Sequence, residues 1–164
     1  MRQASWILAL GCCVWLFVSW ASAQDTSTPT ERAQWVETTH KLESNPLDDS
    51  VNKQGEAALK RVSDVHDIHV PLCPAVLSEF NRMKYVYSHT ITRQYMLASA
   101  AFLIENPEKA ADTKATNLAA VESVLKTYQA VLRQKPDAKA KALDDLLKKQ
   151  SQAKLDGSLQ KQCP

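Results

Sequence analysis

The scarcity of glycine constrains this chain more than any other feature. Three glycines occur in 164 residues, and Gly11 lies in an apolar N-terminal segment. The other two, Gly55 and Gly157, are far apart in the sequence. A phosphate-binding loop of the P-loop or dinucleotide type needs two or three glycines within a few residues. Nucleotide-dependent enzymes of these two types are therefore excluded.

The first 23 residues have the pattern of a secretory signal peptide. Arg2 gives a positively charged start, residues 6–20 form an apolar run, and residues 21–23 are small. We predict cleavage between Ala23 and Gln24, which makes the mature chain periplasmic or secreted, without a stable membrane anchor. Two alternatives stay open: an uncleaved anchor, which needs about 20 apolar residues, and a lipoprotein modified at Cys12.

Charge is nearly balanced, with 20 Lys and Arg against 18 Asp and Glu. Binding to the phosphates of nucleic acid, or to an acidic membrane surface, is driven by an excess of positive charge. We therefore predict no nucleic-acid partner. A protein partner stays open.

The composition indicates an all-α protein. Residues 24–164 contain 17 Ala and 15 Leu, both strong helix formers, and little alternation of β-branched residues. Thr28-Pro29-Thr30-Glu31 is a capping box with proline at the first helical position, which marks a helix start. The periodicity and the later prolines predict helices over 29–43, from 46 to about 62, over 74–81, 84–105 and 113–134, after Pro136, and around Leu155 and Leu159.

We expect these helices to form one bundle of five to seven members, orthogonal or hairpin-stacked, in a single domain of residues 29–164 after a short linker, 24–28. The helix over 84–105 is apolar around much of its circumference, which is typical of a helix surrounded by others, so we place it at the centre. Residues 65–72 alternate between apolar and polar and should be extended.

Several runs resemble a known group of proteins. They are Cys73-Pro74-Ala75-Val76-Leu77, Tyr87-Ser88, Gln94, Ser99-Ala100-Ala101-Phe102-Leu103-Ile104-Glu105-Asn106-Pro107, Val121-Glu122, Tyr128, Leu143-Asp144-Asp145-Leu146-Leu147 and Cys163. Together they look like an uncharacterised family of exported all-α proteins of soil bacteria, over roughly Pro46 to the end. The family has no assigned activity, so the resemblance implies export and a helical fold but no catalytic residue. Tetratricopeptide hairpins are only weakly similar.

Residues 64–73 contain the ligand types of a metal site. His66, His69 and Cys73 lie within eight residues, and two aspartates stand beside them. Zinc or copper accepts such ligands. In an extended segment, however, His66 and His69 point to opposite sides. We interpret them as exposed loop histidines and predict no metal or cofactor, with a small secreted metal-binding protein or enzyme as the alternative.

No catalytic residue is predicted. Ser88, His89 and Ser99 lack a motif that places a serine against a base. The carboxylates of Glu105 and Glu122, a pair of the kind that glycoside hydrolases use, cannot be placed together from sequence. Our interpretation is a non-enzymatic binding or structural module. A helical-repeat adaptor for protein interactions is a second alternative.

Two cysteines, Cys73 and Cys163, follow the predicted signal peptide. An exported chain meets an oxidising compartment, and two cysteines allow one intramolecular pairing. We predict a disulfide between them that holds the C-terminal tail to the start of the helix at Pro74. An intermolecular bridge or a reactive thiol at Cys73 is the alternative.

Overall fold

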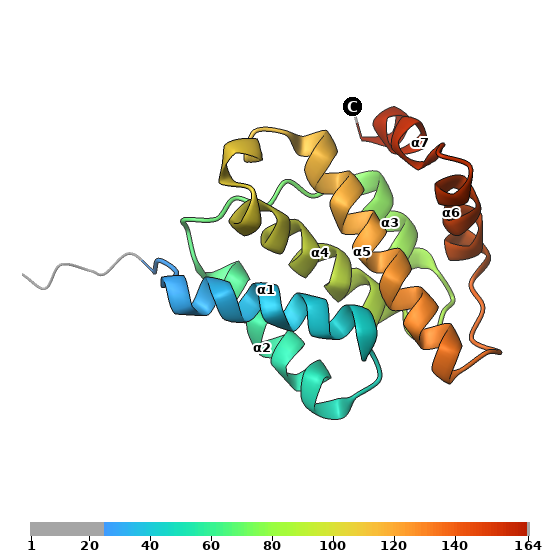
Figure 1. The fold of residues 1–164 in the computed structure, drawn as a ribbon, viewed down its shortest axis with the longest axis horizontal. Helices are drawn as coiled ribbons and strands as arrows, with labels where there is room; N and C mark the ends of the chain where they lie inside the picture. Colours follow the sequence, from blue (N-terminus) through green and yellow to red (C-terminus); the bar gives the residue numbers. More distant parts are fainter. Residues whose placement is uncertain (1–24, 164) are drawn as a thin grey trace, which may run out of the picture.

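The computed structural model describes residues 25–163, so the predicted cleavage site between Ala23 and Gln24 lies outside the described residues. Within this range the chain forms seven α-helices and a short 3-10 helix, and no strand (Figure 1). The elements are α1 (Pro29–Ser44), α2 (Asp49–Asp64), α3 (Pro74–Arg82), α4 (Ser88–Glu105), η1 (Pro107–Lys109), α5 (Thr113–Gln134), α6 (Lys141–Ser151) and α7 (Leu155–Gln162). The all-α bundle is confirmed.

Local capping explains the start of each N-terminal helix. In α1 the backbone N–H of Glu31 donates to the Thr28 hydroxyl at 3.2 Å, and the N–H of Thr28 donates to the Glu31 carboxylate at 2.7 Å. The prediction for α2 began three residues early. Asn45 is the C-cap of α1, and the helix starts at Asp49 because the Asp48 carboxylate caps it. An aspartate that accepts two backbone N–H groups is a strong start signal.

The start of α4 also differs from the prediction, at Ser88 rather than Lys84. The Tyr85 side chain is buried and packs edge-on against the rings of Tyr87 and Tyr128, with centroids 5.6 and 6.1 Å away. These contacts favour a turn before the helix, in which the N–H of Ser88 donates to the Tyr85 carbonyl at 3.0 Å. The periodicity of the sequence cannot report such a tertiary contact.

The central position of α4 is confirmed. It packs against α1, α2, α3 and α5, while α6 and α7 cover the far side of α5 (Figure 1). One face of α4, including Ile91 and Tyr95, belongs to the core formed with α3, α5, α6 and α7. The opposite face, with Leu97 and Ala100, belongs to the core formed with α1 and α2. Because α4 contributes side chains to both cores, it is apolar around much of its circumference.

Polar side chains cross-link the helices inside these cores. The Gln94 amide donates to the Thr39 carbonyl at 3.1 Å and to the Ser123 hydroxyl at 2.7 Å, which joins α1, α4 and α5. The Arg93 guanidinium is 3% exposed and donates to Glu56 and Asn52 of α2. These hydrogen bonds join the helices at defined positions and favour one packing arrangement, although the Nε of Arg93 and the Oε1 of Gln94 have no hydrogen-bond partner among the described residues.

The two cysteines are paired as predicted. Cys73 and Cys163 are joined through their sulfur atoms, with the Cα atoms 5.5 Å apart, and both side chains are buried. The bond connects the residue before α3 with the residue after α7. The hydroxyl of Tyr95 accepts the N–H of Cys73 at 2.9 Å, so a side chain of α4 also holds the residue before α3.

The helices between residues 25 and 163 include none with both the length and the apolar character needed to cross a bilayer.

Candidate functional site

The segment that follows α2 does not assemble a metal site. His66 and His69 are both exposed, and Cys73 is taken up by the disulfide. Among residues 25–163, no three His, Cys, Asp or Glu side chains gather in an arrangement that would hold a metal ion. The segment contains no helix, but it is not extended throughout as predicted. The chain bends at His66 and Asp67, where the N–H of His66 donates to the carbonyl of Asp25 at 3.1 Å.

The Ser99 and His89 side chains are engaged in other contacts. The Ser99 hydroxyl is fully buried and donates to the Tyr95 carbonyl at 2.9 Å, so it is not available to a substrate. The His89 ring faces the Glu56 carboxylate at 3.5 Å. Neither Ser88 nor Ser99 is hydrogen-bonded to a histidine in the described part of the chain, so these residues do not form a nucleophile–base pair there.

A cluster of charged groups joins α1 to α4 and α5. The two ring nitrogens of His40 face Glu105 at 3.2 Å and Glu43 at 3.5 Å, and the Lys126 ammonium lies 3.3 Å from Glu43. Glu122 lines the same small cavity of about 160 Å³. Burial would lower the pKa of His40, but the two carboxylates outweigh it and raise the pKa.

This arrangement makes His40 an ion-pair partner of Glu43 and Glu105, since both of its ring nitrogens face carboxylates. From sequence, Glu105 and Glu122 could not be placed near each other, and no signal singled out His40. The residues are too far apart in the chain for any local pattern to connect them.

An open groove of about 510 Å³ lies between the start of α1, the segment after α2 and the η1 connection. We call it the η1 groove. Its wall is formed by apolar side chains from two parts of the chain, residue 68 and the stretch 103–111: Ile68, Leu103, Ile104, Pro107, Ala110 and Ala111. Three polar residues, Arg32, Asp67 and His69, form its rim. The volume falls within the range of roughly 300–1,000 Å³ that is usual for small-molecule sites, and such sites are mostly apolar with a few polar groups.

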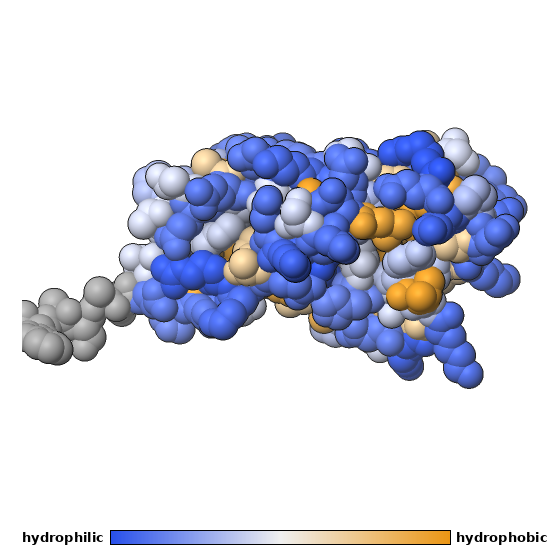
Figure 2. Space-filling view, turned by 90° about the horizontal axis from the view of Figure 1, so that it is seen from below, coloured by the Kyte–Doolittle hydropathy of each residue, from blue (hydrophilic) through white to orange (hydrophobic). Residues whose placement is uncertain are grey.

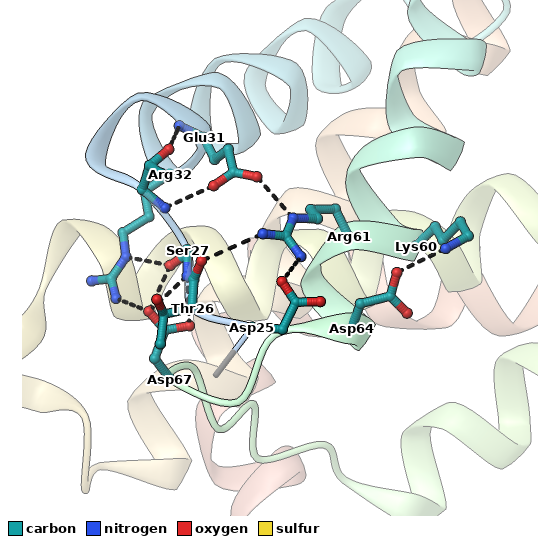
Figure 3. A network of polar contacts seen from close by, with 10 residues as sticks. Asp25, Thr26, Ser27, Glu31, Arg32, Lys60, Arg61, Asp64 and Asp67 are labelled. Carbon is teal, nitrogen blue, oxygen red and sulfur yellow. Dashed lines mark hydrogen bonds and ion pairs between the residues drawn. The ribbon is translucent and has the colours of Figure 1, made fainter. Parts of the chain in front are cut away.

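Hydrogen bonds fix the rim of the η1 groove (Figure 3). The Asp67 carboxylate accepts the N–H of Ser27 at 3.0 Å, the Ser27 hydroxyl at 2.8 Å and the Nη2 of Arg32 at 2.7 Å. The Nε of Arg32 donates to the Ser27 hydroxyl at 2.7 Å. Burial would raise the pKa of Asp67, but the hydrogen bonds from Arg32 and Ser27 hold it at about 2. Asp67 is therefore ionised and compensated at neutral pH.

The same network ties the N-terminal segment to α2. Arg61 donates to the Glu31 carboxylate at 2.8 Å and to the Asp25 carboxylate at 2.5 Å, as Figure 3 shows. The hydrogen bond from Arg61 is the main reason that the pKa of Glu31 falls to about 2. Of the predicted linker, residues 25–28 are described, and they lie against the body of the protein.

A second hollow of about 510 Å³ lies between α1 and α2. Polar and charged side chains line most of it, and Trp35, at its floor, is only 4% exposed. An adaptor that docks a partner on this hairpin would need exposed apolar surface. Among the described residues, the large hydrophobic side chain that stands exposed is Val86, before α4.

The space-filling view agrees with this distribution. Figure 2 shows a mostly hydrophilic face, on which the largest apolar areas lie in the half away from the N-terminal trace and smaller ones are scattered over the rest. The hairpin therefore lacks the feature that would favour the adaptor interpretation. The η1 groove is the hollow whose wall is suited to an apolar ligand.

Comparisons with models of protein families, with curated proteins and with solved structures find no match to this chain.

Proposed function

We propose that the protein is a non-enzymatic binding module that acts outside the cytoplasm, and that the η1 groove binds a small, largely apolar ligand. The observation that carries this proposal is the combination of six apolar wall residues with a compensated, hydrogen-bonded rim. Binding sites of this chemistry retain ligands by burying apolar area while a few polar groups fix the orientation.

The walls of the groove are anchored independently of any ligand. Leu103 is 9% exposed and lies near the end of the central helix α4. Asp67 holds the segment that carries Ile68 through its bonds to Ser27 and Arg32. A groove that is already formed loses little conformational entropy when a ligand enters, which favours binding.

The groove is tested with a neutral fluorescent probe, N-phenyl-1-naphthylamine, whose emission rises in apolar surroundings. Ala111, exposed on the wall, is replaced by aspartate, and Ala33, exposed on α1 outside the groove, receives the same substitution as the matched control. Covering a carboxylate with an apolar ligand costs more than about 1.4 kcal/mol. We expect Ala111→Asp to weaken probe binding more than about tenfold.

Two results would contradict the proposed site. Wild-type protein that gives no saturable rise in emission has no apolar binding site of this kind. Equal affinity in wild type, Ala33→Asp and Ala111→Asp would place the probe elsewhere. Far-UV circular dichroism of both variants checks that the fold is kept.

Export is tested separately. We propose a periplasmic or secreted mature protein because the sequence has a signal-peptide pattern and because a buried disulfide is stable in an oxidising compartment. Fractionation of expressing cells and mass spectrometry of the intact product should find an N-terminus at Gln24. Product retained in the cytoplasm, with residues 1–23 still attached, would contradict this part.

A further inference from the structure

We infer that the ligand of the η1 groove is a single-chain amphiphile with a carboxylate head, and that the head sits at the rim between Arg32 and His69 with the alkyl chain along the apolar wall. This inference rests on the proposed function, because it names the chemical class of ligand for the same groove.

One donor at the rim is not used by any protein group among the described residues. The Asp67 carboxylate already accepts the Ser27 N–H, the Ser27 hydroxyl and the Arg32 Nη2. Arg32 uses Nε and Nη2 in these bonds, and its Nη1 has no hydrogen-bond partner within residues 25–163. A guanidinium has donors only, so the free position of Arg32 calls for an acceptor on the ligand.

The charges at the rim are also compatible with an anionic head group. The positive charge of Arg32 is paired with the Asp67 carboxylate at 2.7 Å, and the exposed imidazole of His69 lines the same groove. No other acidic side chain lines the groove besides Asp67, within the described residues. An anionic head therefore meets no uncompensated negative charge and finds donors on two sides.

The apolar wall of the η1 groove is suited to the alkyl chain of the ligand. Ile68, Leu103 and Ile104 contribute branched apolar side chains, and Pro107 and Ala110 continue the surface along the η1 connection. Burial of apolar area gains roughly 25 cal/mol per Å², and an alkyl chain gains along its whole length. A ligand with a polar group at each end would lose this contribution.

The test is displacement of N-phenyl-1-naphthylamine from purified protein by dodecanoate and by dodecanol, both below their aggregation concentrations. We expect dodecanoate to bind about twofold to fivefold more tightly than dodecanol, the range of one exposed charge interaction. His69→Glu puts a negative charge on the rim. The matched control is His66→Glu, since His66 is equally exposed but does not line the groove.

We expect His69→Glu to weaken dodecanoate binding about twofold to fivefold, with dodecanol unchanged, and His66→Glu to change neither. Equal affinity for the alcohol and the acid, or dodecanoate binding that does not respond to His69→Glu, would overturn the carboxylate inference and leave the groove itself standing. If neither compound displaces the probe, the proposed function fails with it. A short apolar peptide with a free C-terminal carboxylate that binds more tightly than dodecanoate would overturn the choice of an alkyl chain.

Discussion

Gly55 lies in the middle of α2, where a helix normally gains stability when glycine becomes alanine. In this protein the expected sign is reversed. A Cβ atom on Gly55 would stand 2.9 Å from the Cδ1 of Leu42 and 3.1 Å from the Nε of Arg93. Both distances are shorter than ordinary van der Waals contacts. The close approach of α2 to α1 and α4 therefore depends on the missing side chain.

The magnitude follows from two opposing effects. Alanine is favoured over glycine by about 1 kcal/mol in a helix interior, while forcing an extra methyl group into a packed core costs about 1–3 kcal/mol. Leu42 is 1% exposed, and Arg93 is 3% exposed and held by two hydrogen bonds, so neither can move away at low cost. We expect Gly55→Ala to lower the free energy of unfolding by about 1 kcal/mol.

The assay is urea unfolding followed by far-UV circular dichroism. Gly157 in α7 provides the matched control, because a Cβ atom there would meet no other atom within 4 Å. We expect Gly157→Ala to raise the free energy of unfolding by about 0.5–1 kcal/mol. If Gly55→Ala stabilises the protein as much as Gly157→Ala does, the packing argument at the α1–α2–α4 junction is wrong.

Four further predictions concern stability. Replacing both Cys73 and Cys163 by serine should lower the unfolding free energy by about 2–4 kcal/mol in urea titrations. The pKa of Glu31 is lowered from 4.5 to about 2, so its stabilising effect is complete above pH 4.5 and is lost as the pH falls toward 2; Glu31→Gln should flatten that acid limb. The pKa of His40 is raised from 6.5, so its effect is complete below pH 6.5 and is lost as the pH rises through the raised value; His40→Gln should remove this loss. Tyr128→Phe removes a donor to Asp144 and the acceptor of a backbone N–H, and should cost about 1–3 kcal/mol.

Each of these has a clear contrary result. Unfolding midpoints that are the same with and without the disulfide would mean that the C-terminal tail is held by packing alone. An acid limb that survives Glu31→Gln unchanged would assign it to other carboxylates. A loss of stability above pH 6.5 that persists in His40→Gln would place the titrating group elsewhere, and a neutral Tyr128→Phe would mean that water replaces its hydroxyl.

The parts of the fold that were predicted well are those with local signals. The bounds of α5 agree with the prediction because its apolar spacing is regular from Leu118 to Leu132 and because Asp112 caps its start. The capping box placed the start of α1 in the same way. Helix starts that depend on distant contacts, such as the turn held by Tyr85 before α4, were placed wrongly.

The η1 groove could not be predicted for a related reason. Its wall combines Ile68 with residues of the stretch 103–111, and only the tertiary packing brings these two parts of the chain together. The spacing of His66 and His69 in an extended segment predicted that they point to opposite sides, and this stays a prediction because the chain bends at His66 and Asp67. In the structure, His69 lines the groove and His66 does not. The spacing of the two residues could not predict this difference.

The most direct test of the binding proposal is a map of the site by NMR. Isotope-labelled protein is titrated with N-phenyl-1-naphthylamine, and the backbone amide shifts are followed. The account predicts that the shifted amides cluster in residues 67–69 and 103–111, around the η1 groove. Shifts confined to the hollow between α1 and α2, around Gln34 and Ala57, or no saturable shifts, would contradict it.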